Sequence, residues 1–127
     1  MEFGIVGFGR MGERYSNAIQ SLDYKIKFVC DINKKEIGIP FFNDYKQAIQ
    51  DTPIDCLVIS TSGPSHYEIM KYAISKNIQY IICEKPFTTS IKHADEIVSL
   101  LKNSTTRLCV NYIRRFSNVY ENIWNLL

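Results

Sequence analysis

The sequence predicts an α/β protein built on a doubly wound parallel sheet of the Rossmann type. Five short apolar runs, mostly rich in Ile and Val, recur along the chain, and segments of helical period separate them. Runs that are apolar on both faces suit strands inside a parallel sheet, because helices cover both sides of such a sheet. The runs span residues 3–6, 26–30, 54–59, 78–83 and 108–112. Strands that alternate with helices in this way imply right-handed crossovers within one open sheet.

Three of the intervening segments carry apolar stripes at helical spacing. The stripes are Met11, Tyr15, Ala18, Ile19 and Leu22; then Ile69, Met70, Ala73 and Ile74; then Ala94, Ile97, Val98 and Leu101. Pro64 is expected at the first position of the second helix, and Ser90 can cap the third. A shorter helix is predicted over 45–50. Residues 39–42 predict a short strand at an edge of the sheet, because Pro40 has no N–H to donate to a ladder.

Size and composition fit one folded domain, residues 1–127. Hydrophobic residues make up 46% of the chain and charged residues 22%, which is typical of globular proteins. The 15 basic residues are scattered and nearly balanced by 13 acidic ones, a distribution that argues against a nucleic-acid partner. No secretory signal and no apolar run of membrane-spanning length is visible, so we expect a cytoplasmic protein without a membrane partner.

The four cysteines, Cys30, Cys56, Cys83 and Cys109, each fall inside a predicted strand. They lie about one strand–helix unit apart and form no Cys-x-x-Cys pair, so they lack the clustering of metal ligands. We therefore expect small, buried, reduced thiols and no metal site.

The last segment, residues 116–127, predicts a helix with Val119, Ile123, Trp124 and Leu127 along one side. This helix would end without Gly, Pro or a polar tail, whereas helices usually close with a capping residue. The pattern favours a gene product that continues beyond Leu127. A chain complete at Leu127 stays the alternative, since uncapped terminal helices also occur.

A glycine-rich loop, residues 7–12, joins the first predicted strand directly to the first predicted helix. In a dinucleotide-binding turn Gly7 would allow the tight bend, Gly9 would let the backbone approach a pyrophosphate, and Gly12 would let helix and strand pack closely. The phosphates would then meet free N–H groups and the positive end of the helix dipole. Alone, the pattern is weak, because a glycine turn is common.

Asp31 supplies the context that the loop needs. It ends the second predicted strand about 20 residues after the loop, where a carboxylate can accept hydrogen bonds from an adenosine ribose. Its charge would repel the 2′-phosphate of NADP, so NAD is favoured as the cofactor. Lys34 and Lys35 follow closely and keep NADP open.

Three further motifs follow the predicted strands three to five. They are Ser-Thr-Ser-Gly-Pro-Ser-His at 60–66, Glu-Lys-Pro at 84–86 and Asn-Tyr-Ile-Arg-Arg-Phe at 111–116. The first is similar to a Thr-Pro-Asn-x-x-His loop and the third to a Gly-Phe-Asn-Arg-Arg-Phe segment. With the glycine loop, they make essentially the whole chain resemble the glucose-fructose oxidoreductase, inositol dehydrogenase and rhizopine-catabolism family, written Gfo/Idh/MocA. All lie at the carboxyl ends of strands, where open α/β sheets bind ligands.

The resemblance implies the N-terminal NAD(P)-binding domain of an oxidoreductase, and it assigns roles to individual residues. Asp31 would hold the adenosine ribose, Glu84 would lie near the nicotinamide ribose, and Arg115 would approach the nicotinamide end. Lys85 would be the catalytic residue and would also contact the cofactor. The pyrophosphate would be held by Gly7, Phe8, Gly9, Arg10, Met11 and Gly12, and the cofactor cleft would be lined by Thr61, Ser62, Pro64 and His66.

Two of these assignments have structural alternatives. His66 could simply bond a backbone carbonyl at the start of its helix. Arg114 and Arg115 could be an ordinary exposed pair. The chain also departs from the family pattern, with Ser62-Gly63 in place of Pro-Asn, Asn111 in place of a glycine and Asn118 where Pro is common.

The expected activity is hydride transfer between the nicotinamide and a small-molecule substrate, a sugar, cyclitol or related polyol. Oxidation of an alcohol also requires a base or relay against its oxygen, the role expected of Lys85. The family's C-terminal α/β substrate domain is not found in these residues, so the isolated chain is expected to be inactive, and the full-length form is expected to be a homo-oligomer.

Two other functions compete with this interpretation. The first is a stand-alone NAD-binding module with a sensing or regulatory role. The second is a methyltransferase, whose glycine loop and acid after the second strand can look similar. The third glycine, Gly12, at the dinucleotide position and the Glu-Lys-Pro motif argue against the methyltransferase.

Overall fold

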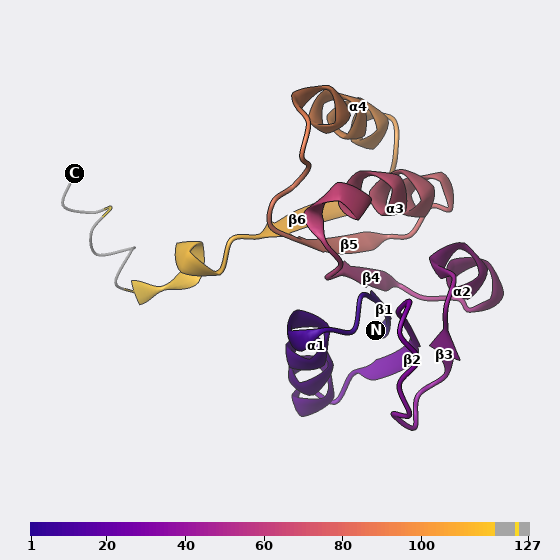
Figure 1. The fold of residues 1–127 in the computed structure, drawn as a ribbon. Helices are drawn as coiled ribbons and strands as arrows, with labels where there is room; N and C mark the ends of the chain where they lie inside the picture. The colour runs from indigo at the N-terminus through magenta and orange to yellow at the C-terminus, as the bar shows by residue number, and fades with distance from the viewer. Residues whose placement is uncertain (119–123, 125–127) are drawn as a thin grey trace.

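The computed structural model describes residues 1–118 and 124, and it contains a six-stranded parallel sheet (Figure 1). The strand order is β3-β2-β1-β4-β5-β6, so the chain winds outward from β1 in both directions. The strands are β1 (Glu2–Val6), β2 (Lys25–Cys30), β3 (Phe41–Phe42), β4 (Cys56–Ile59), β5 (Tyr80–Glu84) and β6 (Arg107–Asn111). This confirms the predicted doubly wound α/β class.

Helices cover the sheet unequally (Figure 1). Helix α1 (Arg10–Ser21) packs on one face, against β1, β2 and β4. The other face carries three α-helices of the described residues, α2 (Tyr45–Asp51), α3 (Gly63–Ser75) and α4 (Ile91–Lys102). A 3-10 turn, η1 (Ile113–Phe116), follows β6. Among residues 1–118 and 124, no helix has both the length and the apolar character that crossing a bilayer requires.

The local predictions are confirmed with shifts of one or two residues. The edge strand expected over 39–42 is reduced to β3, and the Val29 N–H donates to the Pro40 carbonyl at 2.9 Å. Helix α3 begins one residue before Pro64. Ser90 is the N-cap of α4 but forms no capping hydrogen bond with its side chain. The helix predicted over 116–127 falls almost entirely outside the described residues.

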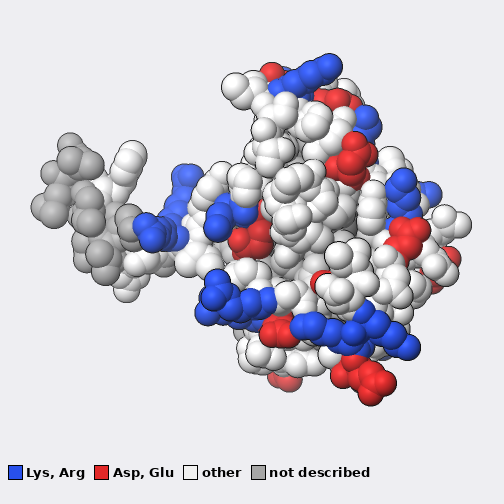
Figure 2. Space-filling model, viewed as in Figure 1, with Lys and Arg blue, Asp and Glu red and all other residues white. Residues whose placement is uncertain are grey.

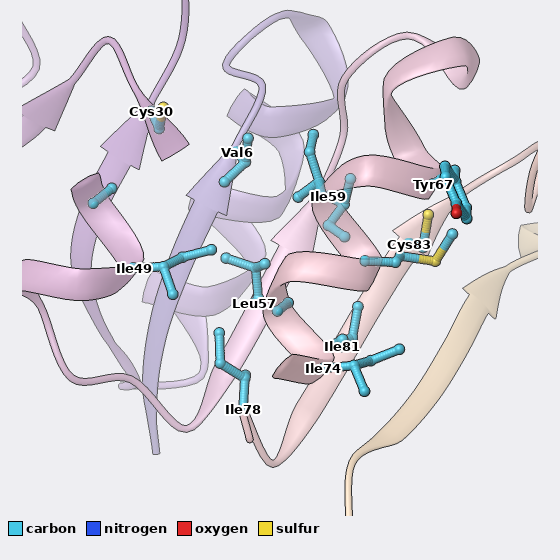
Figure 3. Packing of buried hydrophobic residues seen from close by; sticks show 14 of the residues in the cluster. Val6, Cys30, Ile49, Leu57, Ile59, Tyr67, Ile74, Ile78, Ile81 and Cys83 are labelled. Atoms are coloured by element: carbon cyan, nitrogen blue, oxygen red, sulfur yellow. The ribbon is translucent and has the colours of Figure 1, made fainter. Parts of the chain in front are cut away.

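Two hydrophobic cores lie on opposite faces of the sheet. The larger packs α2, α3 and α4 against one face, and Figure 3 shows Leu57, Ile59, Ile74 and Ile81 among its members, between α3 and the strands. The smaller lies under α1 and contains Ile19 of that helix. Its other buried members are Phe3, Ile5, Phe8, Val29, Cys56 and Val58. Burial on both faces explains why the central strands read as continuous apolar runs.

The cysteines divide three to one. Cys30, Cys56 and Cys83 are buried, whereas Cys109 is exposed, which corrects the expectation that all four are buried. Cys109 pairs with Ile82 in the edge strand β6, on the α1 side of the sheet. Helix α1 packs mainly against β1, β2 and β4 and meets the end of β6 through the Tyr15–Asn111 hydrogen bond. Burial raises the pKa of each of the three core thiols to about 12.

Native thiol labelling tests this division. At pH 8 the raised pKa keeps Cys30, Cys56 and Cys83 protonated as well as shielded, so an aromatic disulfide reagent should modify Cys109 alone. The unfolded chain should react at all four cysteines and release four equivalents of the aromatic thiolate, and Cys109→Ser should abolish the reaction of the folded chain. Rapid modification of two or more cysteines in the folded chain would contradict the described packing.

Candidate dinucleotide site

Two adjoining hollows lie along the carboxyl ends of the strands and share Ser60 and Thr61, which follow β4. The strand order reverses between β1 and β4, so the hollows flank the topological switch point where such sheets bind ligands. Their volumes are about 510 and 690 Å³, within the range of small-molecule sites. Lysine and arginine side chains on the face drawn in Figure 2 are interspersed with acidic ones.

The glycine loop is built as its residues predict. Gly7 has a φ of +91°, and a Cβ there would stand 2.6 Å from the Ser60 carbonyl carbon and from the Thr61 nitrogen. A Cβ on Gly12 would collide with the Gly7 carbonyl oxygen. Gly9, the N-cap of α1, has nothing within 4 Å of the position a Cβ would take. The bend is therefore closed by backbone on one side and open to a ligand at Gly9.

Asp31 is tied to this loop. One carboxylate oxygen, Oδ2, accepts a hydrogen bond from the Phe8 N–H at 2.6 Å, and Oδ1 accepts one from the Asn33 N–H at 2.9 Å. Asp31 lines the first hollow beside Gly7 and Gly9. Each carboxylate oxygen can accept more than one hydrogen bond, so Asp31 retains capacity to accept donors from a ligand in the first hollow.

The loop after β4 is held from three directions. The Ser60 hydroxyl donates to the Gly7 carbonyl at 2.7 Å, and the Ser65 hydroxyl lies 2.8 Å from the Thr61 hydroxyl. The ring of His66 is fully buried, with Nδ1 2.8 Å from the Pro86 carbonyl oxygen and Nε2 3.1 Å from the Thr61 carbonyl oxygen. His66 thus joins two loops and does not line either hollow, which is the structural alternative left open by the sequence.

Glu84 and Lys85 line the second hollow and not the first. The Glu84 side chain is 6% exposed and accepts hydrogen bonds from the Tyr15 hydroxyl and the Asn111 amide, each at 2.8 Å. Burial raises the pKa of Tyr15, and its bond to Glu84 raises it further. Lys85 is exposed and also lines this hollow, and the Lys85–Pro86 peptide bond is cis.

Several predicted site residues do not reach the hollows with their side chains. Phe8 is buried in the core under α1, so it offers only its backbone. Pro64 is exposed in the first turn of α3, away from both linings. Arg114 lines the second hollow, whereas Arg115 does not. The one-residue difference arises because η1 turns the chain just after β6.

Other residues of the site were not predicted. Asn33 and Asn43 line the first hollow, and Tyr15 and Asn111 surround Glu84. Tyr15 counted in the sequence as one member of an apolar stripe, and nothing there signals its hydroxyl. Asn111 was visible only as a departure from a glycine. No group of three His, Cys, Asp or Glu side chains that could hold a metal occurs within residues 1–118 and 124.

The residues present fit a dinucleotide. The first hollow offers an unobstructed backbone at Gly9, the N-terminus of α1 for phosphate oxygens and the Asp31 carboxylate for ribose hydroxyls. The second continues past Thr61 to Glu84 and Lys85, which gives room for another nucleoside. Fold and site together define a dinucleotide-binding domain of the Rossmann class.

Comparison with known families gives the particular assignment. The profile of the Gfo/Idh/MocA family, an oxidoreductase family with an NAD-binding Rossmann fold, matches residues 1–112. The chain therefore belongs to this family, as its motifs predicted.

Individual relatives extend the comparison over the whole chain. The inositol 2-dehydrogenase of Rhodococcus jostii is 30% identical over 138 residues, which cover 100% of this chain and 37% of the relative. That of Salmonella typhimurium is 25% identical over 141 residues and 41% of its length. The chain thus spans about two fifths of the length of these curated relatives.

Solved structures confirm the fold. The scyllo-inositol dehydrogenase from Lactobacillus casei with bound NAD(H) and scyllo-inositol superposes with a TM-score of 0.89 at 22% identity, covering 99% of this chain and 40% of that one. The myo-inositol 2-dehydrogenase from Lactobacillus plantarum gives a TM-score of 0.88 at 24% identity, with the same coverage.

The two glycines Gly7 and Gly9 give a matched test of the loop. Gly7→Ala should lower the free energy of unfolding by roughly 2 kcal/mol or more, because it combines a positive φ with a contact against the backbone of Ser60. Gly9→Ala should stay within about 1 kcal/mol of the wild type, since its Cβ meets open space. Urea denaturation followed by circular dichroism measures both. Equal losses would contradict the description of the loop.

Proposed function

We propose that this chain is the NAD-binding half of a dehydrogenase that moves a hydride between the nicotinamide and a cyclitol, sugar or related polyol. The observation that carries the proposal is the Asp31 carboxylate bonded to the N–H of Phe8, in the glycine turn that opens α1. Relatives of this chain are inositol 2-dehydrogenases, and a structural neighbour was solved with scyllo-inositol, which supports the substrate class.

Each part of the site would hold one part of the cofactor. The backbone from Gly7 to Gly12 and the N-terminus of α1 would hold the pyrophosphate. Asp31 would accept the hydroxyls of the adenosine ribose, and Thr61 would line the passage between the two nucleosides. Bound NAD would supply the hydride acceptor. The group that takes the proton from the alcohol oxygen would be a side chain of the protein.

Lys85 would accept or relay the proton in this proposal. Oxidation of a secondary alcohol releases a proton from its oxygen as the hydride leaves its carbon, so a base or relay must stand against that oxygen. Lys85 lines the second hollow directly after Glu84, at the end of β5. A lysine accepts a proton only after losing its own charge, which burial favours. The described residues leave Lys85 exposed, so that burial would have to come from what covers the hollow.

Asp31 supports NAD over NADP. Its charge faces the first hollow and would repel a 2′-phosphate. Lys35, one of the two cations that kept NADP open, lies 2.6 Å from the Glu13 carboxylate and 5.5 Å from the centre of the Phe8 ring. The charge of Lys35 is therefore paired with Glu13 and is not free to favour a 2′-phosphate.

Titration of the chain with NADH and NADPH tests cofactor binding. NADH should bind more tightly than NADPH, and Asp31→Asn should narrow that preference by about tenfold, because the charge is removed while an oxygen remains for the Phe8 N–H. Asp95→Asn, at an exposed position on α4, serves as the control. Isothermal titration calorimetry gives the dissociation constants. Absence of NADH binding by the wild type would refute the proposal.

A substitution at Lys85 tests the catalytic assignment in the protein that carries both halves. Lys85→Ala should reduce kcat for polyol oxidation by about 10² or more, while the Kd for NADH stays within about threefold. Lys92→Ala, an exposed lysine on α4, should leave both unchanged. Steady-state kinetics with myo-inositol or scyllo-inositol provide the measurement. Full turnover by Lys85→Ala would remove Lys85 from the mechanism.

A further inference from the structure

A closed ring of hydrogen bonds lies behind the second hollow. It joins the Tyr15 hydroxyl from α1, the Glu84 carboxylate from the end of β5 and the Asn111 amide from the end of β6. The Tyr15 hydroxyl and the Asn111 Nδ2 both reach Glu84 Oε1 at 2.8 Å, and the same Nδ2 donates to the Tyr15 oxygen. Strand register brings this about, because Glu84 and Asn111 are direct partners in the β5–β6 ladder.

The ring has one arrangement of donors. A carboxylate is acceptor-only, so both neighbours must present hydrogens to Glu84, and the Asn111 carbonyl oxygen must turn away from it. Burial raises the pKa of Tyr15, so its hydroxyl keeps the proton that it donates. A carboxylate with 6% exposure needs such partners, since an unpaired buried charge is strongly unfavourable.

The two oxygens of Glu84 are used differently. Oε1 takes both side-chain donors, whereas Oε2 receives the Lys85 N–H at a long 3.3 Å. Glu84, Lys85 and Asn111 line the second hollow, but Tyr15 does not. Tyr15 therefore acts on the hollow through Glu84 and Asn111, and the ring of hydrogen bonds leaves Oε2 with capacity to accept another.

We propose that Tyr15 and Asn111 are positioning residues that hold Glu84 so that its Oε2 accepts a hydroxyl of the nicotinamide riboside. The inference rests on the proposed function, because it assumes that NAD occupies the two hollows.

Three ligands that share a scaffold show which part of NAD depends on Tyr15 and Asn111. ADP carries the adenosine and diphosphate only, ADP-ribose adds the second ribose, and NADH adds the nicotinamide. In Tyr15→Phe and Asn111→Ala, the Kd of NADH and of ADP-ribose should each rise about fivefold, while that of ADP stays within twofold, because one oriented acceptor for the second ribose is lost. Tyr24→Phe, at an exposed tyrosine beyond α1, should leave all three unchanged.

The outcomes distinguish a failure of the positioning role from a failure of the proposed function. Calorimetry gives each Kd, and a thermal melt with each variant checks folding; Asn111, in an edge strand, keeps the test available if Tyr15→Phe unfolds. Unchanged affinities, an equal loss for ADP, or a loss for NADH without one for ADP-ribose would overturn the positioning role. Wild-type chain that binds none of the three ligands would instead refute the proposed function.

Discussion

The structure depends on one constraint, the close packing of backbone against backbone at the bend after β1. Gly7 lies against the Ser60–Thr61 peptide and beneath Gly12, at distances that no Cβ permits. This close approach brings α1 down onto β1 and places the end of β4 beside them. The Asp31 carboxylate then receives the N–H of Phe8, so the end of β2 is fixed to the same point. The ends of β1, β2 and β4 and the start of α1 thus meet at one point. Their meeting sets where the groups that face the first hollow lie.

The polar side chains of the site lie at the carboxyl edge of the sheet because the faces of the central strands are covered by apolar side chains. Two apolar cores cover the central strands, and a side chain with a charge there would lose its hydration without compensation. Where the strands end, the backbone turns and exposes donors and acceptors. Glu84, which lines the second hollow, is buried and accepts hydrogen bonds from side chains of α1 and β6, and the buried His66 ring faces carbonyl oxygens of two loops.

Most of the fold was predictable because local pattern and tertiary burial agree. The apolar runs marked the strands, and the glycine loop with Asp31 marked the first hollow. What escaped prediction depends on exposure and on partners distant in the chain. Cys83 and Cys109 both fall in apolar runs, yet Cys83 lies in a central strand under the larger core and Cys109 lies exposed on the edge strand β6. Tyr15 and Glu84 are 69 positions apart, and no spacing rule reports such a contact.

The buried imidazole of His66 has a consequence for the two loops on either side of it. Its ring nitrogens face two carbonyl oxygens, that of Thr61 after β4 and that of Pro86 after β5. Carbonyl oxygens only accept, and a neutral imidazole carries a single N–H. One tautomer therefore donates to Pro86 and the other to Thr61, so the position of one proton decides which of the two loops the ring holds.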